Sequence, residues 1–309
     1  MTKNKFLVVV NPNSGAGKAG KDWEKIKTKL TNAGFDFDVA ISQAHRHSIT
    51  QVKEAIEKGI RHIIVVGGDG TLHHVANGIM LQKTVSSSDI KIGMISIGTG
   101  NDWIRHFEVP KSYDEAIQVI KNGKTAIQDL GKISYTEKNE TLEEYFMNFA
   151  GLGFDAFVVE RTAHLKKYGQ AAYLMGLLQN VIKYKGQKLK VEVDGKVVAE
   201  DDMFMVIAGI GKYGGGGMMI CPNADINDGL FDVNIIRSLS LMEVAMEVAN
   251  LFNGKYIKHK KVSSVRGKQV KVTVLENQEG VKTEADGELF GTGPFQMDII
   301  ENAMQVFVP

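Results

Sequence analysis

Short apolar runs alternate with segments of helical periodicity over roughly the first 130 residues of this 309-residue chain. Phe6–Val10 and Ile63–Val66 are continuously apolar, and Ile92–Ile97 is mainly apolar, which is typical of strands buried on both faces of a parallel sheet. Between such runs, apolar residues recur every three or four positions, as in Trp23–Ala33 and Leu72–Ile79, and this spacing predicts helices. The alternation predicts an α/β domain with a mainly parallel sheet covered by helices.

Three further elements extend this first domain. Phe35–Ile41 alternates apolar and polar residues as a strand does, and Ile49–Ile56 has the periodicity of a helix. Ser112 is followed three residues later by Glu115, which predicts a capping box at the start of another helix.

The pattern changes near Asp129, after which strands follow one another with few helices between them. Asp194-Gly195 is a two-residue hairpin signal, and Ser240 with Glu243 predicts a second capping box. Helical spacing also predicts a helix over Ala171–Ile182. The expected strands are Tyr145–Phe149, Lys188–Val193, Met203–Ile207, Leu230–Ile236, Val270–Leu275 and Val281–Ala285. The second half is therefore expected to be mostly antiparallel β-structure.

Composition narrows the class of protein. Hydrophobic residues make up 43% and charged residues 24%, as in ordinary globular proteins. The net charge of +1 provides no basic field for nucleic acid. The single cysteine, Cys221, excludes an intrachain disulfide, and we expect it to act as a small apolar residue in a cytoplasmic protein. No apolar stretch approaches the roughly 20 residues of a membrane span.

Glycine-rich polar segments follow three of the expected strands. Gly67-Gly68-Asp69-Gly70-Thr71 and Gly98-Thr99-Gly100-Asn101-Asp102 come directly after buried strands, and Asn11–Lys18 follows the first strand. Glycines allow backbone N–H groups to approach a phosphate closely, and ligands of open parallel sheets bind at the carboxyl ends of strands. The local alternatives are tight turns and helix caps. Asn11–Lys18 is not a Walker A loop, because the required spacing is missing and Ala19 stands at the Ser/Thr position.

Taken together, these segments resemble the diacylglycerol/lipid kinase family of soluble bacterial enzymes, which is related to sphingosine and ceramide kinases. The resemblance covers essentially the whole chain. In the second half it rests on three stretches, Gly214–Met218, Pro222–Asp232 and Asp286-Gly287-Glu288. One departure is that Arg46 stands where such enzymes commonly have glycine, while Ser42 can replace a threonine hydroxyl.

The resemblance implies an N-terminal α/β domain like that of NAD kinase and phosphofructokinase, and a C-terminal β-sandwich-like domain. The first would span residues 1–130 plus about 298–309, the second residues 131–297, with ATP between them. It implies Mg²⁺-dependent transfer of the γ-phosphate of ATP to the hydroxyl of diacylglycerol or a related membrane lipid.

The site residues implied by the resemblance fall into three groups. The nucleotide would contact Asn11, Ser14, Gly15, Ser42, Gly67, Gly68, Asp69, Gly70, Thr71, Thr99, Asn101 and Asp102. Catalysis would depend on Asp286, Glu288 and Asp69, with Asp286 or Glu288 as general base. A structural Mg²⁺ would bind the side chains of Asp225 and Asp228 and the Leu230 carbonyl. The alternative for this last stretch is an Asp-Gly turn.

A lipid substrate implies peripheral contact with the inner face of the membrane. Two lysine clusters lie beside apolar residues and are candidates for this contact, although a solvated surface explains each equally well. They are Lys166 and Lys167 before Leu178, and Lys255, Lys258, Lys260 and Lys261 after Phe252. The rival functions are an NAD kinase, which shares the glycine loop, and a catalytically silent nucleotide-binding regulator. The sequence leaves open the lipid and the oligomeric state, a homodimer included.

Overall fold

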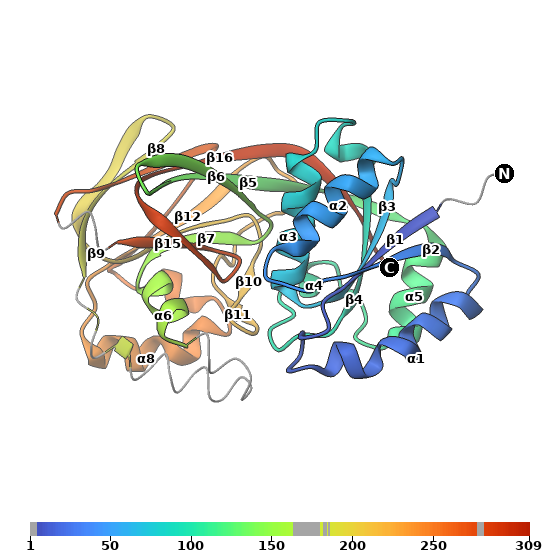
Figure 1. The fold of residues 1–309 in the computed structure, drawn as a ribbon. Helices are drawn as coiled ribbons and strands as arrows, with labels where there is room; N and C mark the ends of the chain where they lie inside the picture. Colours follow the sequence, from blue (N-terminus) through green and yellow to red (C-terminus); the bar gives the residue numbers. More distant parts are fainter. Residues whose placement is uncertain (1–4, 163–179, 182–183, 185, 277–280) are drawn as a thin grey trace. The chain divides into compact units, whose positions relative to one another are not determined.

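The computed structural model describes residues 5–162, 180–181, 184, 186–276 and 281–309. Its contacts divide the chain into two compact units (Figure 1). The first comprises Met1–Gln128 with Asn302–Pro309, and the second comprises Asp129–Glu301. The expected fold class is confirmed, because the first unit is α/β and the second is rich in β-strands.

The first unit is built on a parallel sheet in the order β16-β4-β3-β1-β2. Its strands are β1 (Lys5–Val10), β2 (Asp36–Ile41), β3 (His62–Gly67), β4 (Lys91–Ser96) and the end of β16 (Glu288–Phe307). The central strands are continuously apolar because both faces are covered, and Val8, Ile64 and Val65 are all fully buried.

Helices cover this sheet as their periodicity predicts. Those of the first unit are α1 (Lys18–Asn32), α2 (His47–Glu57), α3 (Asp69–Leu81), α4 (Trp103–His106), α5 (Tyr113–Asn122) and the short 3-10 helix η1 (Ser87–Asp89). Apolar residues of α1 and α5 share one hydrophobic cluster with the sheet. Ser112 is the N-cap of α5, but its side chain makes no capping hydrogen bond, so the predicted capping box there is wrong.

The second unit is a largely antiparallel β-structure. It contains β6 (Glu140–Phe146), β7 (Phe149–Gly153), β8 (Gln187–Val193), β9 (Lys196–Gly209), β12 (Phe231–Arg237), β13 (Val262–Gly267), β14 (Gln269–Val274) and β15 (Lys282–Ala285), with most of β5 (Thr125–Glu137) and β16. A short pair, β10 (Tyr213–Gly214) and β11 (Met218–Met219), lies apart from this sheet. Alternate residues of the long strands form one large hydrophobic cluster, which includes Phe146, Phe231 and Phe295.

Two helices of this unit are described, α6 (Phe154–Thr162) and α8 (Leu241–Leu251), together with the 3-10 helix η3 (Lys255–Lys258). The capping box at the start of α8 is confirmed, because Ser240 and Glu243 bond to each other's backbone N–H. The expected helix over Ala171–Ile182 and the Lys166–Lys167 pair lie outside the described residues, apart from Asn180 and Val181.

One strand prediction needs correction. The expected strand Tyr145–Phe149 is interrupted between β6 and β7, because backbone N–H groups of Met147 and Asn148 bond to the Asp286 carboxylate instead of to a strand. The expected hairpin is confirmed, since Asp194 and Gly195 both have positive φ and join β8 to β9. Among the described residues, no helix is long and apolar enough to cross a membrane.

Candidate functional site

The three glycine-rich segments lie at the carboxyl ends of adjacent parallel strands in the first unit. Asn11–Gly17 follows β1, Gly67 ends β3, and Gly98–Asp102 follows β4. The strand order β4-β3-β1 therefore places the three segments side by side. Gly15 has a φ of 60° and lies close to Ile97: a Cβ atom added to Gly15 would be 3.1 Å from the Cγ2 atom of Ile97. This is the edge at which open parallel sheets bind ligands.

Hydrogen bonds join the first two segments. The Asn11 side-chain amide donates to the Thr71 hydroxyl at 3.1 Å, and the Ser14 hydroxyl lies 3.2 Å from the same oxygen. Thr71 stands in the first turn of α3 and is buried. The two polar residues expected to contact the nucleotide thus anchor the first segment onto the N-terminus of α3, beside Gly70. Free N–H groups at such a helix end attract anions.

Asp69 joins the second segment to the third. Its Oδ2 accepts a hydrogen bond from the Asp102 N–H and its Oδ1 from the Trp103 N–H, both at 3.2 Å. These N–H groups begin α4, so Asp69 caps that short helix from another segment. Asp102 itself is buried, with its Oδ1 3.6 Å from the Arg105 Nε. The two aspartates expected near the nucleotide are therefore neighbours.

The backbones of these two segments touch. A Cβ added to Gly68 would lie 3.3 Å from the Gly98 Cα, and one added to Gly98 would lie 2.9 Å from the Gly68 Cα. Asn101, at a positive φ of 51°, donates its side-chain amide to the Gly98 carbonyl at 2.9 Å. Thr99 lies exposed between these glycines and Asn101. Only glycine leaves room for this crossing of the two backbones, so packing alone favours glycine at both positions.

Buried oxygen atoms at this edge lack protein partners. Among the described residues, the side-chain oxygens Ser42 Oγ, Ser96 Oγ and Asn101 Oδ1 are buried and have no hydrogen-bond partner. Ser42 directly follows β2, and Ser96 ends β4. Buried polar atoms are nearly always paired with protein, water or ligand. Their position fits a polar ligand held at the carboxyl ends of the strands.

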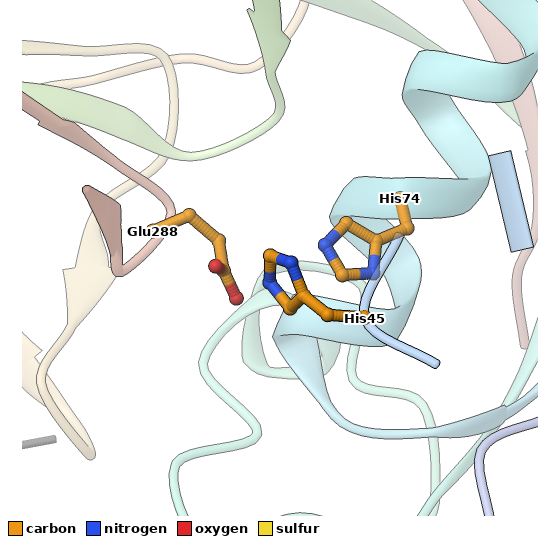
Figure 2. A group of neighbouring side chains, drawn as sticks. All are labelled: His45, His74 and Glu288. Atoms are coloured by element: carbon orange, nitrogen blue, oxygen red, sulfur yellow. The ribbon is translucent and has the colours of Figure 1, made fainter. Parts of the chain in front are cut away.

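Two histidines flank the same edge (Figure 2). The rings of His45 and His74 meet edge to face, with centroids 5.0 Å apart and planes at 88°. His45 belongs to the loop between β2 and α2, and His74 lies on α3. This contact brings the loop that contains Ser42 against the helix that begins at Asp69. Figure 2 also draws Glu288, which belongs to the second unit.

In the second unit, the late acidic motif forms the turn between β15 and β16. Asp286 has a φ of 51°, and its carboxylate accepts N–H groups of Met147 at 2.8 Å and Asn148 at 2.9 Å. The Phe149 N–H also donates to Asp286 Oδ1, at 3.4 Å, so three backbone N–H groups orient this carboxylate. Glu288 begins β16 and is half-buried. The two candidate bases therefore lie on one turn, and Asp286 is the one held by the backbone.

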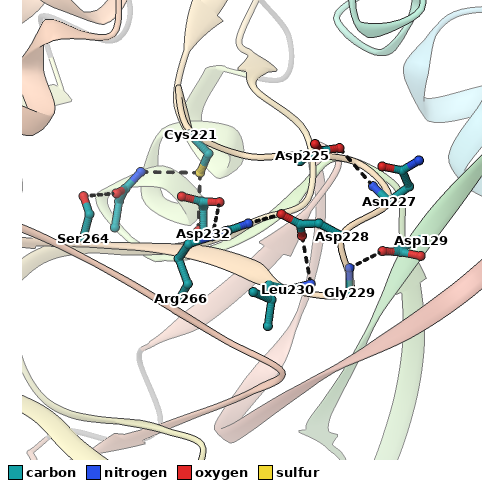
Figure 3. A network of polar contacts seen from close by, with 11 residues as sticks. Asp129, Cys221, Asp225, Asn227, Asp228, Gly229, Leu230, Asp232, Ser264 and Arg266 are labelled. Carbon is teal, nitrogen blue, oxygen red and sulfur yellow. Dashed lines mark hydrogen bonds and ion pairs between the residues drawn. The ribbon is translucent and has the colours of Figure 1, made fainter.

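The expected structural metal site lies in a polar network (Figure 3). Asp228 Oδ1 accepts the Leu230 N–H at 3.1 Å, and its Oδ2 pairs with the Arg266 guanidinium. Asp225 accepts the Asn227 N–H. The guanidinium supplies the positive charge beside Asp228, so this arrangement fits Arg266 rather than a metal ion. The Mg²⁺ site of Asp225, Asp228 and Leu230 stays a prediction.

Comparison with known proteins decides the family. Residues 5–133 match the diacylglycerol kinase catalytic domain, and residues 148–308 match the YegS C-terminal NAD kinase beta sandwich-like domain. A diacylglycerol kinase of Mycobacterium tuberculosis (strain ATCC 25618 / H37Rv) is 30% identical over 310 residues, covering 99% of this chain and 95% of the relative. This chain belongs to the diacylglycerol kinase family.

Solved structures show the same fold. A diacylglycerol kinase of Bacillus anthracis superposes with a TM-score of 0.72 at 22% identity, covering 100% of this chain and 98% of that one. Yeast NADH kinase superposes with a TM-score of 0.58 at 12% identity, covering 100% of this chain and 84% of that one. At these identities the likeness concerns the fold alone. The family match makes this protein a kinase.

Two acids, the buried Glu284 and its neighbour Asp155, lie next to the turn that contains Asp286. Glu284 is 1% exposed and accepts the Gly287 N–H through Oε2 at 2.7 Å. Burial, and then the neighbouring Asp155 carboxyl, raise the pKa of Glu284 well above its usual range. Asp155 comes from α6, next to β7. Glu284 therefore holds the turn that carries the two candidate bases.

Sequence reasoning missed Glu284 and Arg266. Glu284 follows Lys282 and Thr283 in a strand that is mostly polar, so nothing in the sequence distinguishes it from a surface acid. Arg266 faces Asp232 across the β12–β13 pair, with its Nε 3.2 Å from Asp232 Oδ2. Recognising β13 would have suggested this pair, because opposite charges on facing strand positions attract.

The same network contains Asp129 and Cys221. Asp129 Oδ2 accepts the Gly229 N–H at 2.8 Å, and the Asp129 N–H donates to Ile226, so Asp129 fixes the loop before β12 (Figure 3). Cys221 is fully buried, and its burial raises the pKa of the thiol. Its environment is that of a packed apolar residue and not of a nucleophile.

Proposed function

We propose that this protein transfers the γ-phosphate of ATP to the hydroxyl of diacylglycerol or a closely related membrane lipid. The observation that carries the proposal is the meeting of three glycine-rich segments at one sheet edge, where buried oxygens lack protein partners. Relatives that cover 99% of this chain are named diacylglycerol kinases. We place its action at the inner face of the membrane, from the cytoplasm.

The chemistry required of the protein is mainly positioning. Phosphoryl transfer needs neutralisation of phosphate charge and an aligned hydroxyl, with little covalent chemistry by the enzyme. Backbone N–H groups of Gly67–Thr71 would contact the phosphates, and Asp69 and Asp102 are the carboxylates nearest to them. Mg²⁺ brought with ATP would supply the positive charge. The two aspartates would orient that complex while Asp69 keeps the third segment in place.

The attacking hydroxyl needs a general base. An alcohol is a weak nucleophile, and a positioned carboxylate that takes its proton contributes about 10²–10⁴-fold in rate. Asp286 and Glu288 are the candidates, and we favour Asp286 because its carboxylate is oriented by three backbone N–H groups. The proposal requires that this turn reach the ATP γ-phosphate during turnover. Substitution of each acid tests that requirement.

The competing function is phosphorylation of NAD. The fold is shared with NADH kinase, but the Gly98–Asp102 segment and the Pro222–Asp232 stretch follow the lipid kinase pattern. A mixture of diacylglycerol, phosphatidylglycerol, sphingosine and NAD, supplied with γ-labelled ATP, separates the alternatives. The proposal predicts label in a chloroform-extractable lipid. Label in NADP alone, or no transfer to any acceptor, would refute it.

A further inference from the structure

Helix α8 belongs to the second unit (Figure 1), and most of its exposed residues are apolar. We define the α8 apolar face by its exposed residues, Leu241, Met242, Ala245, Met246, Ala249 and Phe252. The side chains of Met242 and Met246 are the most exposed of the large ones, at 71% and 63%. Single exposed apolar residues are common, but a continuous stripe of them along one helix marks an interaction surface.

The other side of α8 is also apolar. Val244 is 8% exposed, and it packs with Leu251 in a hydrophobic cluster of this unit. The polar side chains are held locally, because Glu243 bonds to Lys261 and to the Ser240 N–H, and Glu247 accepts from Asn250. Apart from the stripe of Glu243, Glu247 and Asn250, α8 is apolar, and a helix with so wide an apolar surface is usually buried or in contact with lipid. With 11 residues, α8 is far too short to span a bilayer.

Lysines without carboxylate partners follow the helix. Lys255, Lys258 and Lys260 are exposed, and no acidic side chain in the described parts of the chain forms an ion pair with them. Lys261 differs, since its Nζ lies 2.8 Å from Glu243 Oε2. An uncompensated positive charge therefore adjoins the α8 apolar face. Apolar side chains flanked by lysines suit the boundary between acyl chains and anionic headgroups.

We propose that the α8 apolar face, together with Lys255, Lys258 and Lys260, is the surface by which this protein docks on an anionic lipid leaflet. The proposal rests on the proposed function, because only a membrane substrate requires such docking. The three lysines favour a membrane as the partner, because their positive charge complements anionic headgroups. Each lysine raises the partition coefficient of the protein onto such a membrane roughly fivefold. The apolar side chains then enter the headgroup boundary, with α8 lying in the plane of the membrane.

Vesicle co-sedimentation of the full chain tests the proposal. We compare vesicles of phosphatidylcholine with vesicles containing about 30% phosphatidylglycerol, a composition chosen to give the strongly negative surface that attracts lysines. The double variant Met242→Ser/Met246→Ser and the triple variant Lys255→Glu/Lys258→Glu/Lys260→Glu should each lower partitioning onto the anionic vesicles by tenfold or more. The matched controls are Val197→Ser, exposed by 54% on the β8–β9 hairpin, and Lys25→Glu/Lys53→Glu/Lys121→Glu on helices of the first unit. Both controls should partition within twofold of the wild type.

Two further measurements separate docking from catalysis and from self-association. Turnover of dihexanoylglycerol below its micelle concentration needs no docking, so the α8 variants should keep wild-type rates with it. Light scattering should give one mass for the wild type and both variants. Unchanged vesicle binding in both variants, or a wild-type dimer that the Met242→Ser/Met246→Ser variant dissociates, would overturn the proposal. Failure of the proposed function is a different outcome, in which the wild type binds vesicles yet phosphorylates no diacylglycerol.

Discussion

Gly98→Ala is the substitution that probes the candidate site most sharply without removing a charged group. The new methyl carbon would lie 2.5 Å from Asn101 Oδ1 and 2.9 Å from the Gly68 Cα. Asn101 cannot simply rotate away, because its amide already bonds to the Gly98 carbonyl. The backbones of the second and third segments must therefore separate by several tenths of an ångström.

Overpacking of this kind costs about 1–3 kcal/mol, which is roughly a 5- to 150-fold change in the ratio of folded to unfolded protein. The melting temperature of the first unit should fall by roughly 2–10 °C. ATP turnover should fall more steeply than stability, since the crossing also positions the backbone that we propose contacts the phosphates. Gly68→Ala is the milder companion variant, because its methyl carbon would meet the Gly98 Cα at 3.3 Å, and it should lower the melting temperature less than Gly98→Ala does. A Gly98→Ala protein with wild-type melting temperature and turnover would refute the crossing.

Four further predictions concern charged residues. Asp69→Asn should lower ATP turnover at least about 100-fold while far-ultraviolet circular dichroism stays unchanged; wild-type turnover would remove Asp69 from the site. Asp286→Asn should cut kcat by about 10²–10⁴-fold with little change in ATP affinity by calorimetry; if Glu288→Gln has the larger effect, Glu288 is the base. Arg266→Met should strengthen Mn²⁺ binding measured by electron paramagnetic resonance, because the guanidinium no longer pairs with the Asp228 carboxylate. Equal Mn²⁺ binding by the variant and the wild type would contradict this. Burial raises the pKa of Glu284, so the folded protein keeps a proton on Glu284 that the unfolded chain loses, and the stability of the wild type falls as the pH rises above about 4.5. Glu284→Gln should therefore melt at a higher temperature than the wild type at pH 8, and its melting temperature should change less with pH. The same dependence of melting temperature on pH in both proteins would refute the buried acid.

The parallel strands of the first unit could be predicted because a strand that is buried on both faces is apolar at nearly every position of its sequence. Val8–Val10 and Ile63–Val66 are apolar at every position, and both lie in the sheet centre. Strand β16 could not be predicted over its 20 residues. Its pattern changes along its length as it pairs with β15, β14 and β4 in turn, and it contains Gly293-Pro294, which normally argues against a strand interior.

Part of the candidate site could also be predicted from the sequence, and part could not. The residues of the three segments could be named from the sequence, because glycines and carboxylates after buried strands carry a physical reason for being there. The partners of those residues could not. Asp69 bonds to backbone N–H groups of Asp102 and Trp103, and Asp286 to those of Met147 and Asn148. Every residue except proline has a backbone N–H group, so only the fold determines which of these groups a carboxylate meets.

The central claim, transfer of phosphate from ATP to a lipid hydroxyl, is tested most directly by mass spectrometry of the product. ATP carrying ¹⁸O at all oxygens of its γ-phosphate is supplied with diacylglycerol in anionic vesicles. The account predicts a phosphorylated lipid with three ¹⁸O atoms, because the phosphoryl group brings three and the hydroxyl supplies the unlabelled fourth oxygen. A labelled phosphate found only on NAD or in released inorganic phosphate, with the lipid unchanged, would contradict it.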